Sequence, residues 1–257
     1  MFKYLSIFCL LFILSCSTTP TGRKQLKLLS STKMANLGDE SFSKIKTETP
    51  TTKKSSKKQY IECISKNVLK SIGENANQWE IQVFESEKLN AFALPGKNIG
   101  IYTGMIDFAK DQDQIAAIIG HEIAHVIADH GNERLSQQLV IQAGMQVADV
   151  IIEGDDKKSK NIMALIGAGT QVGILLPFSR KHESEADQLG IQYMAKAGFD
   201  PSGAVKLWQK MKKNSGKSVP EFMSTHPSND TRIKKLQTFL AQNQEIYKSS
   251  TKVNCSN

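Results

Sequence analysis

Histidine, cysteine and aromatic residues are scarce in this sequence. The 257 residues include five histidines and no His-rich tract, which argues against a metal-storage protein or an adhesin. The chain has a net charge of +8, but its one dense basic run, Lys53–Lys58, has no aromatic residues interleaved with it. Nucleic-acid binders more often combine a basic stripe with stacking aromatic side chains. We therefore expect no nucleic-acid partner and interpret the basic run as a solvated linker that could touch an anionic membrane surface.

Two apolar runs stand out, and both are too short to cross a bilayer. Residues 162–176 are almost entirely apolar, but a membrane-spanning helix needs about 20 residues, and this run ends at Pro177. We expect a helical hairpin packed on the domain there, with a membrane span as the alternative. Residues 7–14 follow Lys3 and form the short apolar core of a signal peptide.

The residues after this first run resemble the lipobox of bacterial lipoproteins. Ile13–Cys16 places a small residue before a cysteine that would carry lipid and become the mature N-terminus. Ser17 rather than Asp follows, which in Gram-negative lipoproteins favours the outer membrane. We expect a signal peptide over residues 1–15, a lipidated N-terminus and tether over residues 16–27, and a periplasmic protein anchored by its lipid to the outer membrane. An ordinary cleaved signal peptide is the alternative.

Two cysteines remain in the mature chain. Cys9 leaves with the signal peptide and Cys16 takes the lipid, so Cys63 and Cys255 are left. In an oxidising compartment, two leftover cysteines favour one disulfide, which would join an early helix to the C-terminal tail. Two unpaired thiols are the alternative.

One short region has the alternation of strands. Trp79, Ile81 and Val83 alternate with polar residues, and two further short apolar segments end near Gly96 and Gly104. We expect a small antiparallel sheet of about three strands. One of its strands could remain an exposed edge to which a peptide adds through main-chain hydrogen bonds, or the sheet could be purely structural.

The rest of the chain is predicted to be helical. The length suits one domain over residues 28–248, with a flexible Thr/Ser/Lys-rich linker at about 47–58 and a tail over 249–257. The spacing of apolar residues predicts helices over residues 28–46, 59–72, 115–130, 135–152, 161–176, 179–197, 200–213 and 230–242.

The strongest chemical signal is His121-Glu122-Ile123-Ala124-His125, within the apolar helical stretch 115–130. Four residues make slightly more than one helical turn, so His121 and His125 project from the same face. Two imidazoles at this spacing can bind one Zn²⁺, and Glu122 can reach a water molecule on the metal. The alternative is a buried helix that happens to carry two histidines, which is disfavoured because isolated polar groups on an apolar helix need partners.

A third ligand is expected from a later helix, because catalytic zinc usually takes three protein ligands. Glu183 and Asp187 are spaced to lie on one side of the helix 179–197, whereas Glu185 points away. One carboxylate could ligate the metal while the other holds a ligand histidine by its second ring nitrogen. By itself, such an acidic pair is usually solvated surface.

Together with other motifs, these residues resemble the zinc peptidase family that includes HtpX and the CAAX prenyl proteases, and within it the BepA- and LoiP-like bacterial outer-membrane lipoprotein peptidases. The resemblance implies an α+β, mainly α fold: a helical zincin-type (minigluzincin) metallopeptidase domain with a small antiparallel sheet before the HExxH helix. The motifs that carry it are Thr21–Leu26, Asn90–Gly96, Tyr102–Gly104, His121–His125, Ser179-Arg180 with Glu183–Gly190, and Thr225–Pro227.

The resemblance also implies roles for single residues. Glu183 matches the third zinc ligand, and Asp187 matches the acid that supports the site from behind. His226 matches a histidine near the metal that can steady the oxyanion or occupy the open coordination site; on spacing alone it would be a surface loop residue. Arg232 matches a site-supporting arginine. Lys97-Asn98 departs from the family, which more often has a further Gly here.

The hypothesis that follows is a zinc-dependent endopeptidase of the cell envelope that cleaves misfolded or unassembled envelope proteins. One Zn²⁺ on His121, His125 and Glu183 lowers the pKa of its water toward neutrality. Glu122 takes a proton as this water attacks the peptide carbonyl, then passes it to the leaving amine. The metal and His226 stabilise the oxyanion.

The substrate is expected to lie extended and to pair with Ile99, Gly100, Ile101 and Tyr102. The alternative function is a chaperone or assembly factor for outer-membrane proteins, whose zinc is latent or mainly structural because His226 closes the site as a fourth ligand. Expected partners are unfolded or misassembled envelope proteins, a membrane reached through the N-terminal lipid, and, as a further candidate, the outer-membrane assembly machinery.

Overall fold

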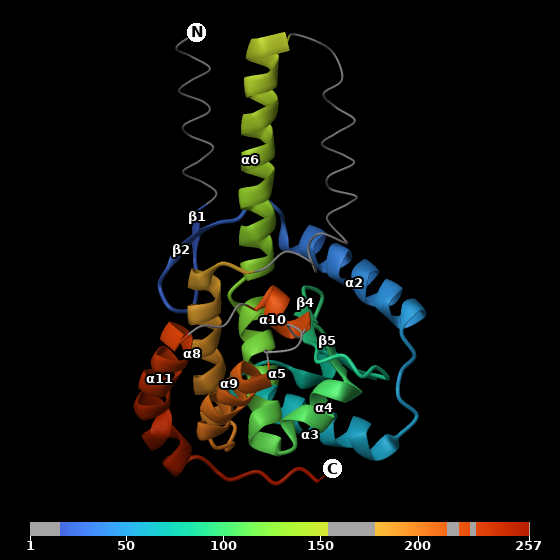
Figure 1. Ribbon diagram of the computed structural model, residues 1–257, viewed down its shortest axis with the longest axis vertical. Helices are drawn as coiled ribbons and strands as arrows, with labels where there is room; N and C mark the ends of the chain where they lie inside the picture. Colours follow the sequence, from blue (N-terminus) through green and yellow to red (C-terminus); the bar gives the residue numbers. More distant parts are fainter. Residues whose placement is uncertain (1–15, 154–177, 215–220, 227–229, 257) are drawn as a thin grey trace.

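The computed structural model describes residues 16–153, 178–214, 221–226 and 230–256. The expected signal peptide and the expected helix 161–176 lie outside these residues. Most of the described residues are helical, and two small sheets, of three and two strands, accompany the helices, so the α+β, mainly α class is confirmed (Figure 1). The helices are α2 (Ser31–Glu48), α3 (Ser55–Ser71), α4 (Thr103–Ala109), α5 (Gln112–Ile127), α6 (His130–Glu153), α8 (Arg180–Lys196), α9 (Ser202–Asn214), α10 (Glu221–Thr225) and α11 (Asp230–Ser249), with a 3₁₀ turn at Ala76–Gln78.

Helix α5 is the central element of the fold. Asp111 caps its first turn by accepting a hydrogen bond from the backbone N–H of Gln114 at 2.8 Å, and the helix is buried from Gln114 to His125. It crosses α8 at Gly120 and Gly190, where a Cβ added to Gly120 would lie 2.8 Å from the backbone oxygen of Gly190. Because neither glycine has a side chain, α5 and α8 can approach closely at this point. The polar residues of the two helices lie near this crossing.

The three-stranded sheet is mixed, not antiparallel as expected. Its strands are β3 (Glu80–Phe84), β4 (Ala91–Leu94) and β5 (Asn98–Tyr102), in the order β3-β5-β4. A turn with positive φ at Gly96 and Lys97 makes β4 and β5 an antiparallel hairpin, whereas β3 pairs with β5 in parallel. Alternating hydrophobicity shows that a strand exists but says nothing of which neighbour it pairs with.

This order corrects the expected substrate strand. Ile99–Tyr102 lies in the central strand β5, whose main chain is already paired on both sides. The outer side of β3 is partly covered as well, because Thr52 donates its N–H to the backbone oxygen of Val83 at 2.8 Å. Within the described part of the chain, β4 is therefore the strand with an open edge, and it faces the middle of α5.

The expected polar tether is a folded hairpin. Strands β1 (Cys16–Thr18) and β2 (Lys24–Leu26) pair antiparallel, and Gly22 adopts a positive φ of 87° in the turn between them. The hairpin lies beside the first turns of α6, which then extends away from the body of the domain (Figure 1). Residues 16–26 therefore pack on the domain and do not form an extended tether.

Two further features concern the ends of the chain and its apolar segments. Cys63 in α3 and Cys255 in the tail form a disulfide, with their Cα atoms 5.9 Å apart. Of the helices that the structure describes, none is long and apolar enough to cross a membrane.

Candidate metal centre

Helix α5 supplies His121, Glu122 and His125. The two histidines lie one turn apart on one face, as predicted, and their Nε2 atoms are 3.1 Å from each other. All three side chains are buried, and Glu122 accepts a hydrogen bond from the backbone N–H of Ala93 on the edge strand β4 at 3.3 Å. The metal-binding face of α5 is therefore next to the open edge of the sheet.

Helix α8 brings Glu183 and Asp187 to the same place. Ser179 caps the helix, and its side chain accepts from the backbone N–H of His182. The two carboxylate oxygens of Glu183 lie 3.5 Å from His121 Nε2 and 3.4 Å from His125 Nε2. Asp187 lies behind His121, with Oδ1 at 3.1 Å from Nδ1.

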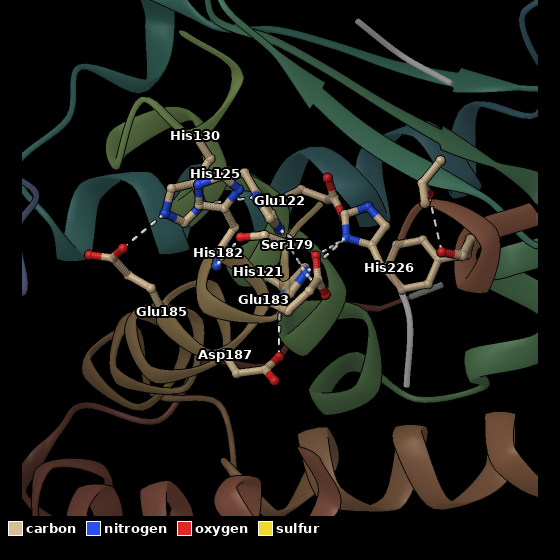
Figure 2. A network of polar contacts seen from close by, with 12 residues as sticks. His121, Glu122, His125, His130, Ser179, His182, Glu183, Glu185, Asp187 and His226 are labelled. Atoms are coloured by element: carbon tan, nitrogen blue, oxygen red, sulfur yellow. Dashed lines mark hydrogen bonds and ion pairs between the residues drawn. The ribbon is translucent and has the colours of Figure 1, made fainter. Parts of the chain in front are cut away.

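His226 joins the cluster from the end of α10. Its ring stacks on Phe222 with centroids 4.5 Å apart, and its Nδ1 lies 3.0 Å from Glu183 Oε1 and 3.2 Å from His121 Nε2. Its Nε2 is 3.4 Å from Glu122 Oε1. Figure 2 shows these side chains converging between α5, α8 and α10.

The donor set suits one zinc ion. Ligand atoms of His121, His125, Glu183 and His226 all lie within 4.8 Å of one another. Two nitrogen or oxygen ligands on a tetrahedral zinc are roughly 3.3–3.5 Å apart, close to the 3.0–3.5 Å separations found here. Buried imidazole lone pairs that face each other repel unless a proton or a cation lies between them. The cluster can therefore hold one metal ion.

Arg232 of α11 holds the acidic side of the site. Its Nε and Nη2 donate to the two oxygens of Asp187 at 2.7 and 2.8 Å, and its Nη1 is 2.5 Å from Glu183 Oε2. The guanidinium stacks over Trp208 at 3.7 Å. Burial opposes the charge of Arg232, but Asp187 and Glu183 outweigh this and raise its pKa. Both carboxylates are thereby fixed in direction and charge.

The environment sets different proton affinities for the acids of the site. Burial raises the pKa of Glu122, although His226 and His121 counteract this, so Glu122 binds a proton more readily than an ordinary glutamate. Burial acts on Glu183 in the same direction, but His226 and Arg232 outweigh it and hold its pKa well below the usual value. This difference suits a base in one position and a permanently ionised ligand in the other.

A second polar cluster behind His125 was not predicted. His130 Nδ1 lies 3.0 Å from His125 Nδ1, and His130 Nε2 lies 3.1 Å from Glu185. Glu185 does point away from the metal-binding face, but it is buried against His130 and not in solvent (Figure 2). His130 lies in the polar stretch Asp129–Arg134, so no hydrophobic pattern in the sequence indicated that it would be buried.

Comparisons with known proteins agree with this site. Residues 55–240 match the family model described as "Peptidase family M48". Mitochondrial metalloendopeptidase OMA1 of Schizosaccharomyces pombe is 32% identical over 187 residues, which are 72% of this chain and 53% of the relative. The OMA1 protein of Arabidopsis thaliana is 34% identical over 62% of this chain and 31% of the relative. The β-barrel assembly-enhancing protease of Yersinia pestis is 27% identical over 68% of this chain and 37% of the relative.

These relatives change two of the expectations. Identity is lower to the bacterial assembly-enhancing protease than to the OMA1 proteins, so the expected nearness to BepA- and LoiP-like peptidases is not supported. The expected periplasmic, outer-membrane location is contradicted, because the OMA1 proteins of Schizosaccharomyces pombe and Saccharomyces cerevisiae, of which this chain covers 53% and 50%, are mitochondrial. The chain spans about half or less of the length of the relatives it matches.

The family match and the site lead to the same assignment. The matched region covers well over half of the chain and contains His121, His125, Glu183 and His226. Peptidases of this family use zinc, and the four side chains can hold one zinc ion, so the predicted cofactor and the zincin-type fold are confirmed. The chain belongs to peptidase family M48, a family of zinc metallopeptidases.

Proposed function

We propose that this chain is a zinc metalloendopeptidase that cleaves extended segments of unfolded proteins. The observation that carries the proposal is the position of Glu122. It lies between the open edge of β4 and the four-donor cluster, which consists of His121, His125, Glu183 and His226. A peptide bond aligned with that edge would lie beside both the metal and the base. This arrangement suits hydrolysis of main chain rather than of side chains.

The proposed ligands are His121, His125 and Glu183. When bound, zinc supplies a Lewis acid that polarises the substrate carbonyl and makes water nucleophilic near neutral pH. Glu122, buried and with a raised pKa, takes the proton of the attacking water and passes it to the leaving amine. Asp187 holds His121 by its second ring nitrogen, and Arg232 holds Asp187.

The substrate would add to β4 as a further strand. In the β4–β5 hairpin, Tyr102 donates its N–H to the backbone oxygen of Asn90, so alternate residues of β4, Ala91 and Ala93, direct their main-chain groups away from β5. A cavity of about 510 Å³ adjoins this edge and would receive one apolar substrate side chain. Its lining includes Met34, Leu37, Ala93, Glu122, Phe178 and His226.

Replacement of the base tests this function. Glu122→Gln keeps the size of the side chain but cannot take a proton, so cleavage of an unfolded model protein should fall by at least about 100-fold while zinc stays bound. Glu40→Gln on the exposed surface of α2 is the matched control and should cleave at the wild-type rate. Full activity of Glu122→Gln with one zinc per chain would overturn the proposal.

A second candidate function is a chaperone or assembly factor with a latent zinc site. The observation in its favour is His226, whose Nδ1 is close enough to Glu183 and His121 to act as a fourth ligand and close the site. The name of the Yersinia pestis relative also refers to β-barrel assembly. If this function holds, wild type and Glu122→Gln should suppress aggregation of an unfolded protein equally, and His226→Ala should gain peptidase activity.

The finer expectations about partners stay predictions. They are envelope proteins as substrates, lipid on Cys16, and contact with an assembly machinery. Mass spectrometry of the mature N-terminus tests the lipid directly, because an unmodified residue there rules it out. Substrate trapping with Glu122→Gln tests the partners.

A further inference from the structure

Arg23 belongs to a motif that the proposed function does not use. It stands directly before β2 in the N-terminal hairpin and reaches two carboxylates on different helices. Its Nε donates to Glu185 Oε2 of α8 at 2.7 Å. Its Nη1 and Nη2 donate to the two oxygens of Glu133 of α6 at 2.8 and 2.6 Å. Thr21 of the same hairpin donates to the other oxygen of Glu185.

The two carboxylates each hold a histidine. Glu185 Oε2 is 3.1 Å from His130 Nε2, and Glu133 Oε2 is 3.0 Å from His182 Nε2. The rings of His130 and His182 stack with centroids 4.6 Å apart and planes 24° from parallel. Because both carboxylates and both rings are buried, the arginine closes a polar cluster inside the domain.

This cluster ends at a proposed zinc ligand. His130 Nδ1 lies 3.0 Å from His125 Nδ1, on the side of the His125 ring opposite the four-donor cluster (Figure 2). The carboxylate of Glu185 only accepts hydrogen bonds, so His130 carries its proton on Nε2 and accepts on Nδ1. His125 must then donate from Nδ1, which leaves the lone pair of its Nε2 directed at the metal.

We propose that Arg23 is a positioning residue of the metal centre. It anchors Glu185, and through Glu185 and His130 it fixes the orientation and the tautomer of His125. The proposal rests on the proposed role of His125 as a zinc ligand. It assigns a function to the Thr21–Leu26 motif: the hairpin completes the zinc site from behind.

The test compares zinc affinity in variants of the full chain. Arg23→Gln should weaken binding of Zn²⁺ by about 10- to 100-fold in competition with a chelator, as expected when the support of a metal-bound histidine is lost. Arg23→Lys keeps the positive charge but lacks the planar guanidinium that donates to two carboxylates. Its zinc affinity should lie between those of Arg23→Gln and wild type. Lys24→Gln makes the same change of charge at the neighbouring exposed position and should bind zinc as wild type does.

A double-mutant cycle separates positioning from general destabilisation. His130→Phe keeps a stacking ring but removes both nitrogens, so in its background Arg23→Gln should cause no further loss of zinc affinity. Glu185→Gln is the second background if His130→Phe does not fold. If Arg23 acts only through global stability, the two losses add; this result, or wild-type zinc affinity in folded Arg23→Gln, overturns the inference.

The proposed function is tested separately in the same preparations. If wild type and Lys24→Gln bind one zinc and cleave an unfolded protein while Arg23→Gln retains wild-type zinc affinity, the positioning role alone fails. If wild type itself binds no zinc, the proposed zinc site fails first.

Discussion

Two arginines from opposite ends of the chain hold the two sides of the metal centre. Arg232, in the last helix, contacts Asp187 and Glu183, and its side chain is 6% exposed. Arg23, in the first hairpin, contacts Glu185 and Glu133, and its side chain is 25% exposed. Each arginine binds a pair of carboxylates, and one member of each pair, Asp187 or Glu185, supports a histidine of α5 either directly or through His130.

The two supports differ in their distance from the metal. Arg232 contacts the proposed ligand Glu183 directly, and it reaches the proposed ligand His121 through one carboxylate, that of Asp187. On the other side, Glu185 reaches His125 only through His130. The difference indicates that the Arg232 side fixes the charge of the site, whereas the Arg23 side fixes the direction of one ring.

Loss of Arg232 should have the largest effect. Arg232→Gln leaves Glu183 and Asp187 buried without their cation, which costs about 3–5 kcal/mol when one partner of a buried ion pair is removed. Urea unfolding in the presence of a chelator measures this for the metal-free protein. Arg23→Gln should cost less, because the Arg23 side chain is itself 25% exposed and water can replace part of its contacts; a larger loss there would reverse the comparison.

Removal of Asp187, which supports His121 directly, should have the second-largest effect. Asp187→Asn keeps the shape but weakens the hold on His121 Nδ1, so zinc affinity should fall by about 10- to 100-fold. Competition with a chelator measures the zinc affinity of Asp187→Asn. The same measurement on Glu185→Gln, which removes the support of His125 through His130, gives the comparison. If the relay through His130 carries the same weight as the direct contact, the two variants will lose affinity equally.

The acid dependence of stability should distinguish the Arg23 side. Burial opposes ionisation of Glu133, but hydrogen bonds from His182 and Arg23 outweigh it and lower its pKa to about 2, from an ordinary 4.5. A group with a lowered pKa in the folded state contributes stability above its ordinary pKa, and this is lost as the pH falls toward the folded value. The unfolding free energy of wild type should therefore decline between about pH 4.5 and pH 2.

Glu133→Gln is the control for this pH dependence. The variant has no carboxylate to titrate at this position, so its decline over the same range should be shallower. The groups that face Glu133 are Arg23, His182 and the side-chain amide of Gln137, and they are the same in both proteins. Parallel curves of urea midpoint against pH would contradict the assignment of this loss to Glu133.

The smallest effect on stability and zinc affinity is expected for a substitution of Thr21. Thr21→Val keeps the shape of the side chain but removes its hydrogen bond to Glu185, a loss of about 1 kcal/mol or less. Arg23 still holds the carboxylate, so zinc affinity should change by less than in Arg23→Gln. A drop as large as that of Arg23→Gln would assign the anchoring of Glu185 to the hydroxyl.

The Arg232 side could be predicted from sequence, and the Arg23 side could not. Helical spacing alone places His121 with His125 and Glu183 with Asp187, because each pair is one turn apart. The same rule predicts that Glu185 points away from the metal, but it does not show that Glu185 belongs to a second buried polar cluster. Arg23 lies in a short polar segment without a hydrophobic pattern, so its long-range contacts leave no periodic signal.

The sheet shows the same limit. Alternation around Ile81 and the short apolar segments around Phe92 and Ile99 predict the strands, yet the order of strands depends on contacts between distant segments. The substrate edge was therefore assigned to β5, the strand that lies in the middle of the sheet. The hairpin turn at Gly96 and Lys97 makes β4 a neighbour of β5, and the parallel pairing of β3 on the other side of β5 leaves β4 outside.

The Cys63–Cys255 bridge encloses the proposed zinc ligands and Glu122 in one covalent ring. The two cysteines are 192 residues apart in sequence, and every residue from His121 to Arg232 lies between them. A single proteolytic cut in that interval leaves both fragments attached to each other. Such a nicked molecule keeps its size on a gel until a reductant opens the ring.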